Sequence, residues 1–249
     1  WPRECWRRQR APYLFHGVEL MAAVTHVYSS GITTNTTQYN TTIAPTVDDL
    51  LVVFAVGTAT AAAATLTDNK GGTYTVAASA TMATSAHELY AWIGNQLVST
   101  SSMTLSLGFT GDPASGRVLS VYSVSGMLQT GSAARQQFQV ASNQAAGTPA
   151  LTFSASVSSS NPTLGCIFNL TNPATVTPPT NWTEGGDVGY GSPTAGGESV
   201  FRNDTFNGTT ITWGSSSASG FAAVALELNT AAAAASAWRP VRLLVGVGP

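Results

Sequence analysis

Charged side chains are scarce in this sequence. Only 9% of its 249 residues are Asp, Glu, Lys or Arg, against about 25% in an ordinary soluble domain. Lys70 is the only lysine, and no basic stripe runs through the body of the chain. We therefore do not expect nucleic-acid binding, which depends on neutralising phosphates. Solubility must come from Thr, Ser, Asn and Gln, a weakly charged surface that suits a secreted or virion-borne protein.

Metal-ligand spacings and long apolar runs are also missing. The two cysteines, Cys5 and Cys166, lie far apart, so two free thiols are expected rather than a disulfide. The three histidines, His16, His26 and His87, are scattered, which disfavours both a zinc site and a Ser–His–Asp triad. No stretch approaches the roughly 18 consecutive apolar residues of a membrane span, so no membrane association is expected.

Helical patterns are absent and strand patterns take their place. No segment of convincing length carries apolar residues at a helical spacing. Apolar and polar residues alternate instead over 103–109 and 151–154, and Gly, Pro, Asn and Asp separate such segments. A period of two is typical of strands with one buried face. The sequence therefore predicts an all-β protein whose strands are half buried in a sandwich.

The chain contains an internal repeat that divides it into residues 21–128 and 129–229. Five elements recur in the same order in both segments. The matched ranges are 26–28 with 137–140, 49–56 with 162–170, 88–93 with 198–202, 103–109 with 209–214, and 116–122 with 220–228. We predict a duplicated antiparallel β-sandwich, jelly-roll-like and pseudo-twofold. Two tandem Ig-like modules are the alternative, although the short joint between the halves favours one compact body.

The two ends of the chain differ from the repeat. Residues 1–20 are rich in Trp and Arg and show no strand alternation, and both the composition and the pattern change at Met21. We expect Met21 to be the natural start and residues 1–20 to be upstream sequence read in frame. A signal peptide is the other explanation, but no apolar region separates the arginines from Met21. Residues 230–249 form an apolar and basic tail, either an arm that docks on a neighbouring subunit or a disordered terminus.

Four segments carry a resemblance to a known class of proteins. They are the Asp-Leu-Leu-Val-Val-Phe strand at 49–54, the Thr-Pro-Pro-x-x-Trp-Thr turn at 177–183, the glutamate-led strand at 198–202 and the closing Ala-Val-Ala-Leu-Glu-Leu strand at 223–228. Together they resemble virion proteins of tailed bacteriophages over residues 21–229.

That resemblance implies a role and a location. It implies a non-enzymatic β-sandwich displayed on a capsid or tail as a decoration, fibre or adhesion module, outside the cell. The expected partners are other virion proteins, further copies of the chain, and host-surface glycans. The resemblance offers no catalytic residue, and we expect no cofactor.

A carbohydrate-active protein is the alternative function. Jelly-roll glycoside hydrolases set two carboxylates on a concave sheet. Glu88 shares a strand face with Tyr90 and Trp92, and Glu198 occupies the equivalent place in the second repeat. A twofold axis between the halves would allow the two glutamates to face each other. The plainer interpretation is that each glutamate lies at the solvated start of a strand.

Aromatic rings and loop carboxylates are the remaining candidates for binding. Exposed rings would stack on a glycan, whereas the plainer interpretation places the same rings in the core. The candidate rings are Trp92, Tyr90, Trp182, Tyr190 and Trp213. Calcium would need loop oxygens. The candidates for this are Asp48, Asp49, Asp68, Asn69 and Asp187, although the Asp68-Asn69 pair is equally typical of a hairpin turn.

Overall fold

The computed structural model is built almost entirely of β-strands. It describes residues 22–33, 36–58, 64–82, 87–109, 116–191, 194–203 and 206–230. The strands of the first half are β1 (Ala23–Ile32), β2 (Gln38–Ile43), β3 (Leu50–Thr58), β4 (Thr65–Asp68), β5 (Tyr74–Met82), β6 (His87–Leu97), β7 (Met103–Gly108) and β8 (Arg117–Ser125). A short 3-10 turn, η2 (Gly131–Ala134), leads into the second half. Its strands are β9 (Arg135–Gln144), β10 (Ala150–Thr152), β11 (Thr163–Asn169), β12 (Thr183–Gly191), β13 (Thr194–Arg202), β14 (Thr210–Thr212) and β15 (Phe221–Leu228).

The two halves repeat one topology. The first large sheet has the order β1-β8-β3-β6-β5, and the second has the order β9-β15-β11-β13-β12. Each strand of the second sheet is the repeat equivalent of the strand at the same place in the first. The smaller sheets, β2-β7-β4 and β10-β14, also correspond, although β4 has no counterpart. All pairs are antiparallel, and three in each half are nested as in a jelly roll, namely β1-β8, β2-β7 and β3-β6, and β9-β15, β10-β14 and β11-β13. The predicted all-β, duplicated sandwich is confirmed.

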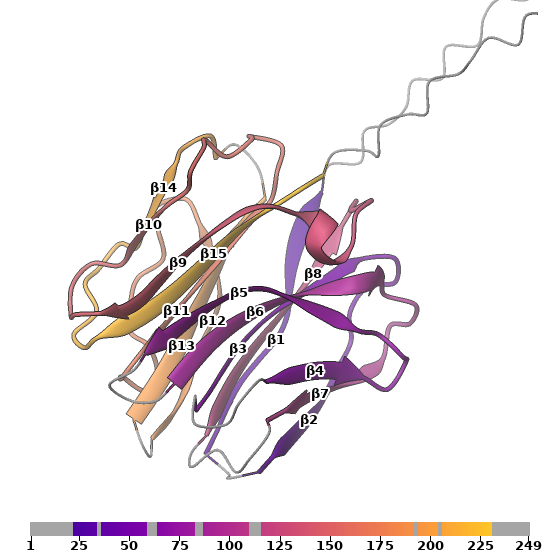
Figure 1. The fold of residues 1–249 in the computed structure, drawn as a ribbon, viewed down its shortest axis with the longest axis horizontal. Coiled ribbons are helices and arrows are strands. Elements are labelled where there is room, and N and C mark those ends of the chain that lie inside the picture. Colours follow the sequence, from indigo (N-terminus) through magenta and orange to yellow (C-terminus); the bar gives the residue numbers. More distant parts are fainter. Residues whose placement is uncertain are drawn as a thin grey trace, which may run out of the picture.

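Four layers of strands stack on one another. Figure 1 shows them in order, from β10-β14 through the second and first large sheets to β2-β7-β4. The inner faces of the two large sheets enclose a shared apolar core, to which both halves contribute. Two further cores lie on the outer faces, one against β2-β7-β4 and one against β10-β14. Because the halves share the central core, they form one compact body.

This layering corrects the expectation that every strand is half buried. Strands β11 and β15 are buried along their whole length, and so are residues 50–57 of β3. Each lies in a sheet that is covered on both faces, so a continuous apolar run suits it better than alternation. Alternating burial is confirmed for β7, which belongs to an outer layer and has one face toward solvent.

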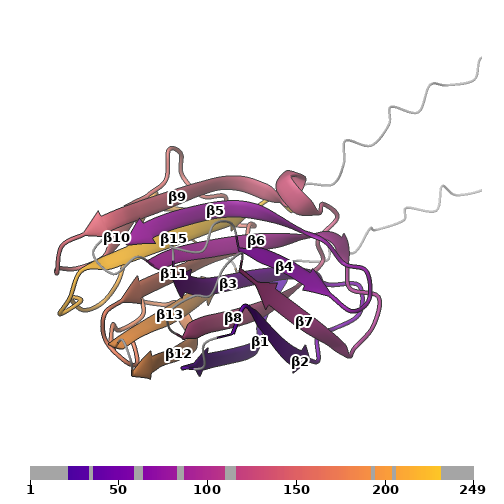
Figure 2. The same ribbon diagram turned by 60° about the horizontal axis from the view of Figure 1, so that its bottom comes forward.

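The edges of the large sheets meet in two equivalent seams. Strand β1 packs beside β12, and β5 packs beside β9, as Figure 2 shows for β5 and β9. Exchanging each strand for its repeat equivalent converts one seam into the other, which is the relation expected of a pseudo-twofold axis. At the first seam a Cβ on Gly31 would lie 2.0 Å from the carbonyl oxygen of Gly189, so the two backbones are in direct contact.

Several sequence-based expectations concern residues outside the described part. The proposed start at Met21, the tail, Cys5 and His16 all belong to this group. Cys166 is a buried free thiol, as predicted. Within the described residues, no helix has the length and apolar character needed to cross a membrane.

Candidate functional site

The structure does not bring the two candidate catalytic glutamates together. Glu88 lies on β6 and Glu198 on β13, and each points to the outer face of its own large sheet. This orientation follows from the alternation of each strand, since the flanking Leu89 and the nearby Phe201 belong to the central core. Because the large sheets pack through their inner faces, the two carboxylates face away from each other. The expected acid pair on one concave face is therefore not formed.

The two glutamates also differ in environment. Glu88 is partly exposed and accepts a hydrogen bond of 2.7 Å from the hydroxyl of Tyr90. Glu198 has no exposed surface. Their repeat-equivalent positions therefore hold carboxyl groups with different chemistry, one solvated and one buried.

Most of the aromatic rings proposed for glycan stacking are core residues. Trp92, Tyr190 and Trp213 are each only 1% exposed, and Tyr90 stacks on Trp92 at 5.0 Å between ring centroids. A ring needs an open face to stack on a sugar, so the burial of these four rings agrees with the interpretation that places them in the core. Trp182 is half buried and packs edge-on against Phe206 at 5.5 Å.

The histidines take part in short polar contacts without forming a triad. His26 Nε2 lies 2.6 Å from the hydroxyl of Ser29, three residues along the bulged strand β1. Burial lowers the pKa of His26, which favours the neutral ring. Buried His87 contacts the hydroxyl of Tyr190 at 2.5 Å, across the central core. Neither contact is made with a carboxylate, which a Ser–His–Asp triad requires. The first contact lies within β1, and the second joins β6 to β12.

The loop carboxylates considered for calcium are mostly engaged in backbone structure. Asp68 accepts hydrogen bonds from the N–H groups of Lys70 and Gly72, at 2.7 and 2.9 Å. These are the bonds expected of an Asp in a hairpin turn. Buried Asp49 accepts one of 2.6 Å from the hydroxyl of Ser123. Among the described residues, no three or more His, Cys, Asp or Glu side chains form a group that could hold a metal ion.

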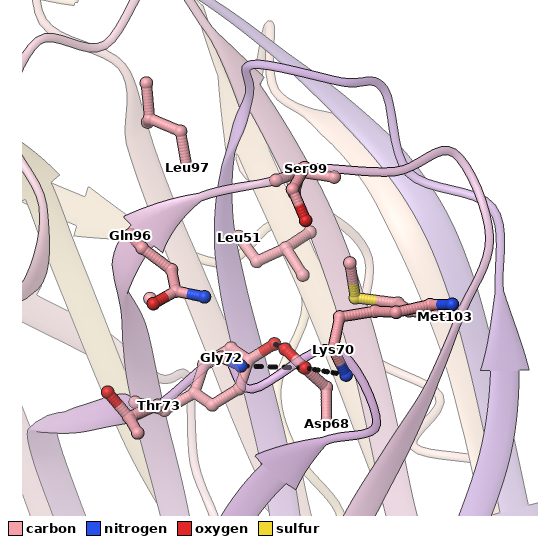
Figure 3. A pocket seen from close by; sticks show the side chains of 12 residues that line it. Leu51, Asp68, Lys70, Gly72, Thr73, Gln96, Leu97, Ser99 and Met103 are labelled. Carbon is pink, nitrogen blue, oxygen red and sulfur yellow. Dashed lines mark hydrogen bonds between the residues drawn. The ribbon is translucent and has the colours of Figure 1, made fainter.

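A small pocket opens beside the turn that Asp68 forms. Figure 3 shows Lys70 and Gln96 on its rim, with the dashed hydrogen bonds that fix the turn at Asp68. The hydroxyl of Tyr74 donates to the second Asp68 oxygen at 2.9 Å. Burial, together with this neighbouring carboxylate, raises the pKa of Tyr74. With a volume of about 10 Å³, the pocket has room for about one water molecule, so a larger ligand would contact its rim rather than enter it.

Sequence reasoning missed the pairing of two acids at the edge of the second large sheet. Asp187 on β12 stands directly opposite Glu198 on β13. Both oxygens of Glu198 and Oδ1 of Asp187 are buried and have no side-chain partner, and only the backbone amides of Val176 and Ala174 act on the two carboxyl groups to favour their charged forms. Sequence reasoning named both residues for different reasons and did not connect them, because the register between β12 and β13 is not visible in the sequence.

The electrostatics of this pair are unusual for carboxylic acids. Burial, then the charges of Glu184 and Asp187, raises the pKa of Glu198 to about 8, and the nearby amide of Val176 offsets this only in part. Burial and Glu184 raise the pKa of Asp187 to about 6, with a smaller opposing effect from the backbone of Ala174. Strongly raised carboxyl pKa values are a property that functional sites share with some structural networks.

Comparison with known proteins adds no identification. No protein-family model, no curated protein and no solved structure matches the chain.

Proposed function

We propose that the chain is a non-enzymatic structural component of a bacteriophage particle, acting as a capsid decoration, fibre or tail adhesion module. The observation that carries the proposal is the nested jelly-roll order in each half. Jelly rolls recur in viral capsid and lectin domains, and the support is therefore an analogy of fold. The weakly charged, Thr- and Ser-rich composition and the sequence resemblance point the same way.

Exposed apolar side chains on strand β9 supply a contact surface for such a role. Strand β9 ends the second large sheet and packs beside β5 of the first large sheet. Two of its apolar side chains are nevertheless exposed, Phe138 to 41% and Val140 to 37%. Exposed apolar side chains that lie close together favour association with another chain.

Self-association is the simplest test of this surface. We expect the purified protein to associate in sedimentation experiments and the Phe138→Ser substitution to weaken association at least about tenfold, a loss of roughly 1.4 kcal/mol. Val47→Ser is the matched control, because Val47 is 43% exposed in the connection between β2 and β3 of the first half. A protein that stays monomeric and binds neither virion proteins nor glycans would contradict the proposal.

Carbohydrate binding without hydrolysis is the second candidate, favoured by the pocket beside Asp68. The polar side chains of Lys70, Thr73 and Gln96 line the pocket together with Tyr74. We expect any glycan that binds on an array to lose binding on Lys70→Ala or Gln96→Ala substitution. Retention of binding by both variants would place the glycan elsewhere.

A further inference from the structure

The Asp187–Glu198 pair lies under a covering segment on the outer face of the second large sheet. Residues directly opposite on antiparallel strands have Cβ atoms about 4.5–5.5 Å apart, so their carboxyl groups are within reach of each other. Segment 170–176 packs tightly over the neighbouring pair of glycines. A Cβ on Gly196 would lie 2.4 Å from the carbonyl oxygen of Thr171 and 2.5 Å from the amide nitrogen of Ala174.

None of the titratable groups that influence the pKa values of the pair carries a positive charge. These groups are Glu184 on β12, Tyr122 on β8 and Cys166 on β11, all acids. His26 on β1 lies on the inner side, 3.6 Å from where a Gly186 Cβ would stand, and burial lowers its pKa, which favours the neutral ring. Arg202 lies four residues along β13 from Glu198, with its guanidinium 5.7 Å from the Phe206 ring, and segment 170–182 has no titratable side chain. Glu198 is fully buried and Asp187 is half-buried, so two negative charges here would repel and one compensating positive charge is favoured.

That charge is a proton or a metal ion, and the contacts favour the proton. Calcium takes six to eight oxygen ligands, whereas the described residues offer no group of three acidic or other metal-binding side chains. The covering segment turns backbone amides of Ala174 and Val176 toward the carboxyl groups, and N–H groups are not metal ligands. A protonated Glu198 would donate to the buried oxygen of Asp187 and so pair two of the three buried carboxyl oxygens.

We propose that Asp187 and Glu198 share one proton, and that this carboxyl–carboxylate pair holds edge strand β12 and segment 170–176 on the body of the protein. Loss of the shared proton then loosens this edge. The inference does not depend on the proposed virion role.

Because β12 forms part of the joint between the halves, the charge of the pair affects how firmly that joint is held. Strand β12 pairs with β13 on one side and packs against β1 of the first half on the other. It is rich in glycine, and Gly185 and Gly186 leave room for Tyr122 and Ser29 of the first half. A strand with so few side chains is weakly held. Repulsion between two ionised carboxylates would therefore open the β1–β12 seam first.

The pH at which this happens follows from the two groups together. Burial and the neighbouring Glu184 raise the pKa of Asp187 to about 6 and that of Glu198 to about 8. Because the groups interact, their protons leave in two steps that belong to the pair. The pair is singly protonated near neutral pH and doubly charged in mildly alkaline solution.

Hydrogen exchange of β12 tests the proposal. Between about pH 6 and pH 9, after correction for intrinsic exchange, we expect protection of residues 183–191 to fall at least about tenfold in the wild type. In Glu198→Gln the protection should not change with pH, because the amide is neutral and can donate to Asp187. Glu88→Gln is the matched control and should behave as the wild type, since Glu88 is the partly exposed repeat equivalent.

Other outcomes would overturn the proposal. An equal loss of protection in Glu198→Gln would show that another group controls the edge. Restored protection in calcium chloride relative to chelator at alkaline pH would show a metal bridge instead of a proton. If Glu198→Gln does not fold, carbon-13 NMR of the wild-type carboxyl groups decides the question. Titration of both residues below about pH 5 would exclude a shared proton, and a step above pH 7 would support it.

Discussion

The contact between Gly31 and Gly189 offers a sharp test of how the halves fit together. A methyl group at position 31 would lie 2.0 Å from the Gly189 carbonyl oxygen, 2.6 Å from its carbon and 2.8 Å from its nitrogen. All three atoms belong to the backbone, so no side-chain rotation can relieve the overlap. The Gly31→Ala substitution therefore requires β1 and β12 to move apart by more than 1 Å.

We expect the loss of unfolding free energy in Gly31→Ala to lie at the upper end of the range for overpacked cores. Forcing extra atoms into a well-packed core costs about 1–3 kcal/mol, and occasionally more. We expect about 3 kcal/mol for Gly31→Ala, because the displaced atoms carry the strand with them. For a protein of this size, 1 kcal/mol lowers the melting temperature by about 2–4 °C, so the fall should be about 6–12 °C.

Thermal unfolding measured beside a matched variant checks this magnitude. Gly191 lies on the same strand β12, and a Cβ there meets only the Asn172 side chain at 3.6 Å, an ordinary van der Waals contact. Gly191→Ala should therefore change the melting temperature by no more than about 2 °C. If the melting temperature of Gly31→Ala equalled that of Gly191→Ala, the two backbones would not be in contact and the close seam between the halves would be refuted.

Three further predictions concern buried groups. The pKa of Glu198 is raised in the folded state, so the free energy of unfolding should fall as pH rises from about 4.5 to 8. Glu198→Gln should remove this slope and gain roughly 2 kcal/mol at pH 8 in denaturant titrations, and an unchanged slope would contradict it. In a Cys5→Ser background, Cys166 should react with a thiol reagent only on unfolding, because burial raises its pKa and blocks access; rapid native labelling would refute this. Trp213→Ala should cost about 3–5 kcal/mol and half-buried Trp182→Ala clearly less, as measured by chemical denaturation.

The repeat was predictable because matched strands carry matched patterns. The ranges aligned from the sequence became equivalent strands, such as β3 with β11 and β8 with β15. Repeat copies that keep the order of apolar strands and turns keep the same pairing, since each apolar face must be covered in the same way. The all-β class and the single compact body follow from this reasoning.

The candidate site was less predictable because it depends on which faces are covered. Alternation places Glu88, Tyr90 and Trp92 on one face, and the structure agrees, but the sequence does not show that a third layer covers that face. A face expected to bind sugar is therefore a core. The opposition of Asp187 and Glu198 depends on strand register and on the bulge between Glu184 and Gly186, neither of which a single sequence displays.

The first half forms the equivalent sheet with one acid in place of the acid pair. In the first half, Glu88 stands opposite Thr81 on β5, the repeat equivalent of the place that Asp187 occupies on β12. A hydroxyl opposite a glutamate is thus compatible with the same sheet. The Asp187→Thr substitution would place the same hydroxyl opposite Glu198. It should leave a single buried carboxyl group, Glu198, that stays neutral and accepts a hydrogen bond from the Thr hydroxyl or donates one to it.

We therefore expect Asp187→Thr to fold, to keep the wild-type melting temperature at about pH 6 within roughly 3 °C, and to lose less protection in β12 than the wild type on moving to pH 9. The reason is that removing one acid removes the repulsion that the second ionisation creates. Hydrogen exchange and thermal unfolding at the two pH values measure both effects. A variant that unfolds at pH 6 would show instead that a hydroxyl cannot replace the Asp187 carboxylate in holding β12, so that the two halves have diverged in structure as well as in charge.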